Sequence, residues 1–342
     1  MKTKYFLLSA FFLVVSSACG KKETIKSAPQ SKASDTIVKS DTLPTDAQGI
    51  RKESINLFIL TPKDSSDIAF VSLSDIYPGD DQDTLALPNI EKMGKHDAQY
   101  FTFEKNYRKR FLSKINVLET DSVFVYDYAK NKRVSFAVKN LKTAAMLNGY
   151  SIGEDWPYQN YDFMIGFEIN KKYLKGFSEY YQDALVYVGK ENPFSKQPLT
   201  PIKWKKITAK EFPSKAIKNE DQKILKGTTP ADIYTFKTND YHYFLQNYND
   251  NRKIIYARRL LVINAKTNEI IIDNLYSPSE GTSPTPLNYK EGDDVINQWT
   301  GKLFKNKPPV VFGFLYKSFG CPEISIIDKS NEEIYLQCDN RH

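Results

Sequence analysis

The sequence predicts a β-rich α+β fold made of antiparallel hairpins with a few short helices. Apolar and aromatic residues make up 41% of the 342 residues, and the 22 Tyr and 21 Phe alone can supply a sizeable core. Beyond residue 54 these residues gather in short runs separated by polar turns, an arrangement typical of strands. The length allows one large β-rich domain or two smaller ones.

Three pairs of runs predict hairpins, because each pair flanks a short turn of polar residues or proline. The pairs are residues 55–60 with 67–73, 122–126 with 133–138, and 260–263 with 269–272. The last two pairs are alike in turn and in strand placement and lie about 136 residues apart. Two explanations stay open: duplicated halves, or the recurrence of polar turns in any β protein.

Three segments predict short helices. Residues 139–148 end before Gly149, a residue favoured just after a helix C-terminus. Residues 170–182 place Tyr and Phe side chains on one helical face, with Asn170 as the N-terminal cap. Residues 293–300 begin with two aspartates, which the positive end of the helix dipole stabilises.

Two segments rich in Pro, Ser, Thr and Lys, 192–230 and 276–290, predict long connections. The first of them is the candidate internal boundary of a β-rich globular region that spans residues 55–342. Residues 20–54 contain no aromatic side chain and predict a flexible tether in front of that region.

The first twenty residues predict export. Lys2 and Lys4 precede an apolar run at residues 5–15, about half the ~20 residues that a membrane-spanning helix needs. Residues 16–18 are small enough to fit a signal peptidase, and Cys19 follows them with a thiol that can carry a lipid. The pattern indicates a cleaved signal peptide.

This segment resembles the lipobox of bacterial lipoproteins, and the resemblance does not extend beyond the signal. It implies removal of residues 1–18 and a mature N-terminus at Cys19 that bears palmitate or similar acyl chains, enough for stable membrane attachment. Gly20 stands in the position where Asp favours inner-membrane retention, so the resemblance implies an outer-membrane lipoprotein. It leaves undecided whether the protein faces the periplasm or the cell surface. Ser16 departs from the aliphatic residue common there, which leaves conventional secretion as the alternative.

The charge disfavours nucleic acid as a partner. The formal net charge of +7 becomes +5 once the two signal lysines are removed, and the basic residues are spread along the chain. A nucleic-acid surface needs a continuous basic stripe. We expect the densest clusters, residues 108–110 and 203–206, to be solvated faces near an anionic membrane.

Two cysteines remain beside Cys19. Residues 322–328 and 333–338 read as two strands, and a turn centred between residues 329 and 330 puts Cys321 directly opposite Cys338. Directly opposed residues of an antiparallel pair are close enough for a disulfide, which an exported protein is expected to form. Two structural free thiols are one alternative. The other is a nucleophilic cysteine with His242 or His342 as its base.

The most ligand-like stretch is residues 155–163, where aromatic rings alternate with amides and carboxylates. Aromatic faces stack on the C–H faces of a sugar while amides and carboxylates bind its hydroxyls. The alternative is a connection whose aromatic residues cover the core, which is also our interpretation of the aromatic residues at 241–248. The candidate ligand-binding residues are Asp155, Trp156, Tyr158, Asn160, Tyr161 and Asp162.

Neither a metal nor a cofactor is predicted. The acidic stretch 80–83, with Asp75 upstream, could supply oxygens for Ca²⁺ but lacks the glycine and terminal glutamate of an EF-hand loop, so we interpret it as a solvated turn. Residues 291–294 are explained as the acidic first turn of a helix. No zinc-protease or phosphate-loop motif is present in the sequence.

The sequence therefore predicts a membrane-anchored exported lipoprotein that acts as a non-catalytic binding module at the cell envelope. Its expected partners are the membrane, through the lipid anchor, and a protein, glycan or toxin ligand. The alternative is a surface or periplasmic carbohydrate-active hydrolase that uses paired carboxylates, with Asp155 and Asp162 as the first residues to test.

Overall fold

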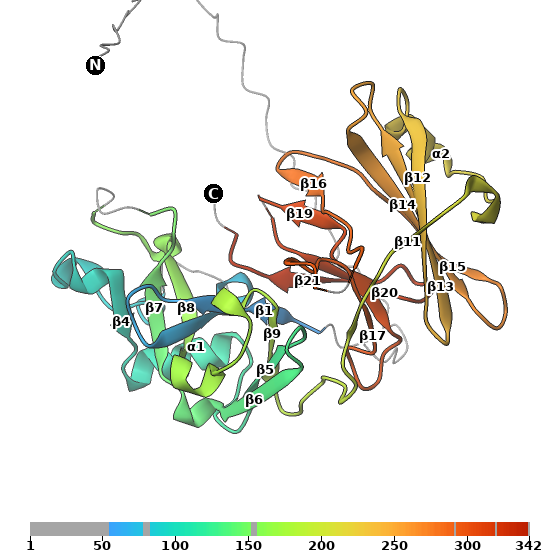
Figure 1. Cartoon of the computed structure of the whole chain (residues 1–342). Coiled ribbons are helices and arrows are strands. Elements are labelled where there is room, and N and C mark those ends of the chain that lie inside the picture. Colours follow the sequence, from blue (N-terminus) through green and yellow to red (C-terminus); the bar gives the residue numbers. More distant parts are fainter. Residues whose placement is uncertain (1–54, 78–82, 152–155, 291, 319, 341–342) are drawn as a thin grey trace, which may run out of the picture. The chain divides into compact units, whose positions relative to one another are not determined.

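Strands dominate the computed structural model, which describes residues 55–340 except 78–82, 152–155, 291 and 319 (Figure 1). The predicted β-rich α+β class is confirmed by three multistranded sheets and a two-stranded one, joined by short helical segments. Cys19, the signal peptide and the tether lie outside the described residues. Those predictions therefore stay predictions.

The largest sheet has nine strands, and it joins the first described strand to the last. Its spatial order is β10 (Thr200–Pro201), β17 (Trp299–Gly301), β18 (Val310–Phe312), β20 (Glu323–Ile326), β21 (Glu333–Gln337), β1 (Leu57–Ile59), β9 (Ala184–Gly189), β5 (Ser122–Asp127) and β6 (Lys132–Ala137). β1 and β21 pair in parallel, with Leu57 opposite Leu336. Strands from both sides of residues 192–230 thus share one sheet.

A five-stranded antiparallel sheet packs on one face of the β1, β9, β5 and β6 strands. Its order is β2 (Thr61–Pro62), β3 (Ile68–Ser72), β8 (Phe163–Asn170), β7 (Thr143–Leu147) and β4 (Tyr100–Thr102). The side chains between the two sheets form the largest hydrophobic core, in which Val71, Phe167 and Val125 are almost fully buried.

The second five-stranded sheet is a meander that follows chain order. Its strands are β11 (Lys205–Ile207), β12 (Thr229–Lys237), β13 (Tyr241–Asn249), β14 (Ile255–Asn264) and β15 (Ile270–Tyr276). β16 (Thr282–Pro284) pairs with β19 (Leu315–Lys317) beside it. A separate core, with Leu245, Leu260 and Phe314 at its centre, lies between this meander and the C-terminal strands.

Both faces of the central strands are buried, so these strands read as continuous apolar runs. Successive side chains of a strand point to opposite faces. Phe58 and Val186 therefore enter the core shared with the five-stranded sheet of β2, β3, β8, β7 and β4. Leu57 and Leu185 enter a second core on the other face. Full burial of each such side chain contributes roughly 1.5–3 kcal/mol.

Helical segments are short in the described part of the chain. The α-helices are α1 (Lys105–Lys114) and α2 (Asn219–Ile224). The 3₁₀ turns are η1 (Ser74–Ile76), η2 (Ile90–Lys92), η3 (Asp97–Gln99), η4 (Val138–Asn140), η6 (Asn160–Asp162), η7 (Lys171–Leu174), η8 (Glu179–Tyr181) and η9 (Ala209–Glu211). Helix α1 is not among the predicted helices, because its charged sequence buries only Phe111 and Leu112 and lacks a repeating apolar face.

All three helix predictions are wrong. Residues 139–148 form η4 and strand β7, because pairing with β4 and β8 outweighs the intrinsic helix preference of Ala, Met and Leu. Residues 170–182 form η7 and η8, although Asn170 does accept a hydrogen bond from the Lys172 N–H (3.0 Å). Residues 293–300 form no helix, and they end in β17.

Two of the three predicted hairpins form as expected, namely β5–β6 and β14–β15. Their turns are alike, since Asn131 and Asn268 both have positive φ (48° and 55°). The first predicted hairpin is only partly right. Thr61 and Pro62 pair with β3, but the preceding strand β1 belongs to the nine-stranded sheet.

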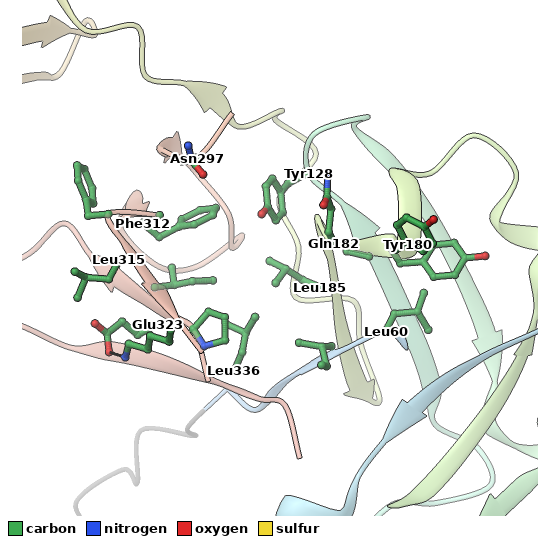
Figure 2. A pocket seen from close by; sticks show the side chains of 18 of the residues that line it. Leu60, Tyr128, Tyr180, Gln182, Leu185, Asn297, Phe312, Leu315, Glu323 and Leu336 are labelled. Atoms are coloured by element: carbon green, nitrogen blue, oxygen red, sulfur yellow. Dashed lines mark hydrogen bonds and ion pairs between the residues drawn. The ribbon is translucent and has the colours of Figure 1, made fainter. Parts of the chain in front are cut away.

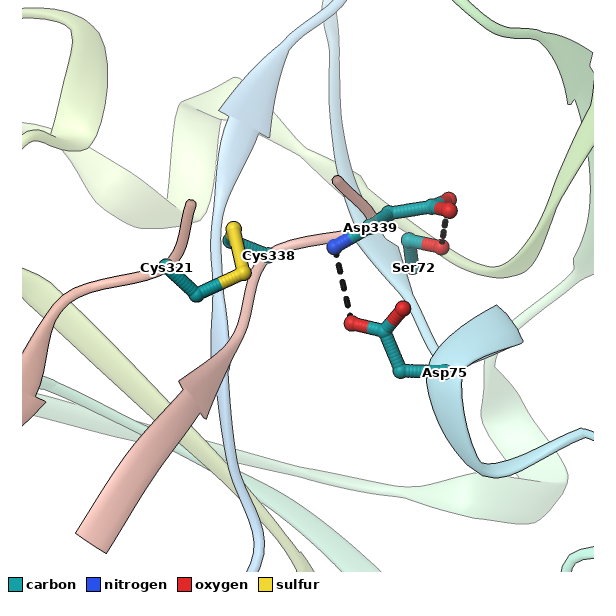
Figure 3. The surroundings of a disulfide bond; sticks show 5 residues. All are labelled: Ser72, Asp75, Cys321, Cys338 and Asp339. Carbon is teal, nitrogen blue, oxygen red and sulfur yellow. Dashed lines mark hydrogen bonds between the residues drawn. A yellow bond between two sulfur atoms is a disulfide. The ribbon is translucent and has the colours of Figure 1, made fainter. Parts of the chain in front are cut away.

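The predicted disulfide between Cys321 and Cys338 is confirmed, with Cα atoms 5.5 Å apart (Figure 3). The expected register is off by one residue, because Ile324 lies opposite Ile334 and both cysteines fall just beyond the paired strands. Next to the bridge, Ser72 Oγ donates to Asp339 Oδ2 (2.6 Å) and the Asp339 N–H donates to Asp75 Oδ2 (2.8 Å). The end of β21 is thus held to the segment after β3.

Removal of the bridge should destabilise the protein. A Cys321→Ser/Cys338→Ser double variant should lose about 2–4 kcal/mol of unfolding free energy. The bridge joins residues 17 positions apart, and the loop that it closes restricts the unfolded chain. Urea unfolding of the variant, of the wild type and of the reduced wild type measures the effect. Equal stability of all three would contradict a structural role for the bridge.

A buried ion pair joins strands β14 and β15 of the meander sheet. Arg259 contacts both carboxylate oxygens of Asp273, at 2.8 and 3.0 Å, and both side chains are less than 5% exposed. Lys215 adds a third contact at 3.1 Å. Burial pushes the pKa of Asp273 upward, but hydrogen bonds from Arg259 and Lys215 outweigh it and hold the pKa below its ordinary value.

Asp273→Asn should cost about 3–5 kcal/mol of unfolding free energy at neutral pH, because it leaves the Arg259 charge buried without a carboxylate. Since the folded-state pKa of Asp273 lies below the unfolded value, its contribution is complete above about pH 4 and declines as the pH falls through the folded pKa. Urea unfolding between pH 3 and 7 tests both points. Asp232→Asn, in an exposed pair with Lys206, is the control and should change stability by less than about 1 kcal/mol.

Candidate functional site

An apolar cavity of about 380 Å³ opens at the centre of the nine-stranded sheet (Figure 2). Strands β1, β9, β18, β20 and β21 all contribute to its wall. Figure 2 shows Leu60 and Leu185 on one side of the space and Phe312 and Leu315 on the other. The first and last strands of the domain therefore build this cavity together. We call it the aromatic cavity.

Six aromatic rings line the aromatic cavity, and several contact one another. Tyr276 and Phe314 stack with ring centroids 4.7 Å apart, and Tyr128 meets Phe312 edge-on at 5.3 Å. Gly313 separates the two phenylalanines at a φ of +89°, and a Cβ there would clash with the Asn297 carbonyl. The six residues are Tyr128, Tyr180, Tyr181, Tyr276, Phe312 and Phe314.

Two consecutive tyrosines at the edge of the aromatic cavity have a strained backbone. Tyr180 and Tyr181 have φ values of 50° and 58°, a left-handed conformation that costs about 1–2 kcal/mol for a residue with a side chain. The buried carboxylate of Asp127 accepts hydrogen bonds from the N–H groups of Ser178 and Lys130 and so holds the segment in front of them. Such strain clusters at functional sites.

Polar groups around the aromatic cavity are few. Lys317 Nζ lies 2.6 Å from Glu323 Oε2, and both side chains are 21% exposed. Gln182, Asn297 and Ser325 add uncharged hydrogen-bonding groups. Among the described residues that line the aromatic cavity, Glu323 is the one carboxylate, and its charge is balanced by Lys317.

Two phenols in the wall remain protonated at neutral pH. Burial and the neighbouring Asp183 carboxylate raise the pKa of Tyr128 well above its ordinary value. Burial likewise raises the pKa of Tyr276, whose hydroxyl has no hydrogen-bond partner of good geometry among the described residues. The Tyr128 O–H donates to Asp183, so the Tyr276 O–H is the one of the two without a partner among the described residues.

The residues predicted to bind a ligand lie elsewhere, and none of those described lines the aromatic cavity. Tyr158 is only 3% exposed and packs edge-on against Trp156 and Phe163 in the core of the five-stranded sheet of β2, β3, β8, β7 and β4. Asp162 accepts hydrogen bonds from the Gln159 N–H (2.7 Å) and Ser151 Oγ (3.0 Å) in the η6 turn. These two residues have structural roles.

Two of the remaining predicted ligand residues lie in the η6 turn, and neither lines the aromatic cavity. Asn160 lies in the same η6 turn, and Tyr161 is 70% exposed. Asp155 lies outside the described residues. In the second aromatic cluster, Tyr243 and Tyr248 are buried, as expected for packing.

The acidic segments serve as ion-pair and turn-forming groups where they are described. Asp83 pairs with Arg110 at 2.6 Å, while residues 80–82 lie outside the described part. Asp293 accepts the N–H groups of Tyr289 (2.9 Å) and Lys290 (3.0 Å) in a turn, which corrects the predicted helix start. Within the described ranges no cluster of three or more His, Cys, Asp or Glu could hold a metal ion.

Several side chains of the basic clusters, residues 108–110 and 203–206, contact other groups of the protein. Arg108 contacts both carboxylate oxygens of Glu119 (2.8 and 2.7 Å) and donates to the Leu141 carbonyl (2.6 Å). Lys206 pairs with Asp232 at 2.8 Å, and Lys203 donates to the Lys290 carbonyl at 2.7 Å. Lys109, Lys205 and Lys206 are exposed, as expected for a solvated face, while Arg108 is tied to the domain.

Comparison with protein-family models, curated proteins and solved structures gave no match. In the described part of the chain, no helix has the length and apolar character needed to cross a membrane.

Proposed function

We propose that this protein is an exported lipoprotein, anchored to the outer membrane through Cys19, whose folded domain binds a compact ligand in the aromatic cavity without catalysis. The observation that carries the proposal is the aromatic cavity itself. A volume of about 380 Å³ lies in the range of small-molecule sites, and an apolar lining with a few polar groups is their usual composition.

The lining favours a ligand with an apolar face and a few hydroxyl or carbonyl groups. Aromatic rings stack on the C–H faces of a sugar or pack against hydrocarbon. Gln182 and Asn297 then supply hydrogen bonds at the edge. A single sugar residue of an envelope glycan, or one apolar group of a partner protein or toxin, matches these requirements.

The hydrolase alternative gains no support from the same geometry. Glycoside hydrolysis needs two carboxyl groups about 5–10 Å apart around the scissile bond. Glu323 alone supplies a carboxylate among the described residues lining the aromatic cavity, and it is neutralised by Lys317. Asp183 contacts the Tyr128 hydroxyl but does not line the aromatic cavity.

Ligand binding can be tested with the neutral fluorescent dye 1-N-phenylnaphthylamine. The wild type should bind it saturably, and Leu315→Trp should weaken binding at least about tenfold because the larger ring occupies the aromatic cavity. Tyr316→Trp, at the neighbouring exposed position of β19, is the matched control and should bind like the wild type. Thermal unfolding verifies that both variants fold.

Two results would contradict the proposed site. One is the absence of saturable dye binding to the wild type. The other is equal binding by Leu315→Trp, which would place the dye elsewhere on the protein.

The lipid anchor is tested by replacing its thiol. Cys19→Ser should abolish incorporation of a palmitate analogue and move the protein from the membrane to the soluble fraction. Intact-mass analysis of the extracted wild type should show an acylated N-terminus at Cys19. The Cys321→Ser/Cys338→Ser variant, which keeps Cys19, should remain labelled, whereas an unlabelled wild type would overturn the lipoprotein assignment.

A further inference from the structure

Strand β6 (Lys132–Ala137) forms an open edge of the nine-stranded sheet (Figure 1). It pairs with β5 on one side only, from Lys132 opposite Asp127 to Ala137 opposite Ser122. On its other side, no backbone hydrogen bond from a described residue reaches the backbone of residues 132–137. Unpaired N–H and C=O groups of this kind are a template for another strand.

The other long edge strand, β15, is covered. Lys218 Nζ donates to the backbone carbonyl of Asp273 at 2.7 Å. Arg259 bonds the carbonyls of Lys215 and Ala216 at 3.1 and 3.0 Å, which holds that segment beside β15. Covering an edge is the usual protection against unwanted pairing, and β6 lacks it among the described contacts.

The charged residues at the start of β6 do not block its edge. Lys132 donates to the Lys175 carbonyl at 3.2 Å. Arg133 lies over the ring of Tyr126, 4.0 Å from its centroid, and donates to the Ser195 carbonyl at 2.8 Å. Both side chains are tied to carbonyls of the domain, and among the described residues no backbone–backbone hydrogen bond joins these segments to β6.

A groove of about 550 Å³ runs beside β6. Val134 and Phe136 of β6 form one wall, and Ile68 and Leu141 belong to the lining. Tyr173 meets Phe136 edge-on with ring centroids 5.7 Å apart and is 55% exposed. Because alternate side chains of a strand point the same way, a strand added to β6 would place every second side chain in this groove.

The rim of the groove is basic. Lys142 lines it, and Lys172 lies over the Tyr173 ring at 4.8 Å. The one carboxylate of the lining, Glu168, accepts a hydrogen bond from the Tyr100 hydroxyl (2.6 Å), and Lys63 lies over that tyrosine ring. Lys142 and Glu168 balance each other within the lining, so the positive excess comes from Lys172 and Lys63 beside the groove, and it favours an acidic partner.

We propose that β6 is a docking edge for an extended, acidic segment of a partner protein, which pairs with the β6 backbone and inserts alternate apolar side chains into the adjoining groove. This interaction is separate from ligand binding in the aromatic cavity. Main-chain hydrogen bonds would supply affinity, and the groove and its lysines would select sequence.

The test uses a fluorescent hexapeptide that alternates glutamate and valine. It should bind the full-length protein, and it should slow amide hydrogen exchange of residues 132–137. A lysine–valine hexapeptide and a backbone N-methylated glutamate–valine hexapeptide are the probe controls. Each should bind at least about tenfold more weakly, through charge repulsion and loss of pairing respectively.

Protein variants separate this proposal from the first. Lys142→Glu should weaken binding of the glutamate–valine peptide roughly fivefold or more, whereas Lys226→Glu, outside the groove, should not. Leu315→Trp should leave peptide binding unchanged, so failure at the aromatic cavity and failure at β6 are distinguishable. No binding at millimolar peptide, or binding without altered exchange in β6, would overturn the proposal.

Discussion

The parallel pairing of β1 with β21 is the constraint on which the rest of the structure depends. Leu57 lies opposite Leu336, so the start and the end of the described chain meet in the middle of one sheet. Every other strand pairing among the described residues is antiparallel. Without this pair the nine-stranded sheet would separate into two pieces, and the aromatic cavity would lose one of its walls.

Several contacts far apart in sequence keep that junction in place. The disulfide and the contacts of Asp339 with Ser72 and Asp75 hold the end of β21. Asp127, at the end of β5, positions the segment that carries Tyr180 and Tyr181 in their strained conformation. Polar contacts outside the apolar wall of the aromatic cavity therefore hold the segments that form it, as expected when local strain is compensated by its surroundings.

The position of the aromatic cavity could not be predicted from local sequence. Residues 155–162 attract attention because aromatic and polar residues alternate there, but Tyr158 is buried in the core and Asp162 closes a turn. Exposure of an aromatic ring depends on what packs against it, which a linear segment does not reveal. The lining of the aromatic cavity comes from several short segments far apart in the sequence. Leu60 and Leu336 come together only through the β1–β21 pair.

By itself, the sequence determined the β-rich class, two complete hairpins and the Cys321–Cys338 bridge, because strand alternation, turn residues and cysteine spacing act over short distances. Tertiary structure decided the fate of residues 139–148, where burial between β4 and β8 outweighs helix preference. It also decided which strands became neighbours, which edge stayed open and where the aromatic cavity formed. Those features depend on long-range pairing and burial, whose free energies exceed any local propensity and have no short sequence signature.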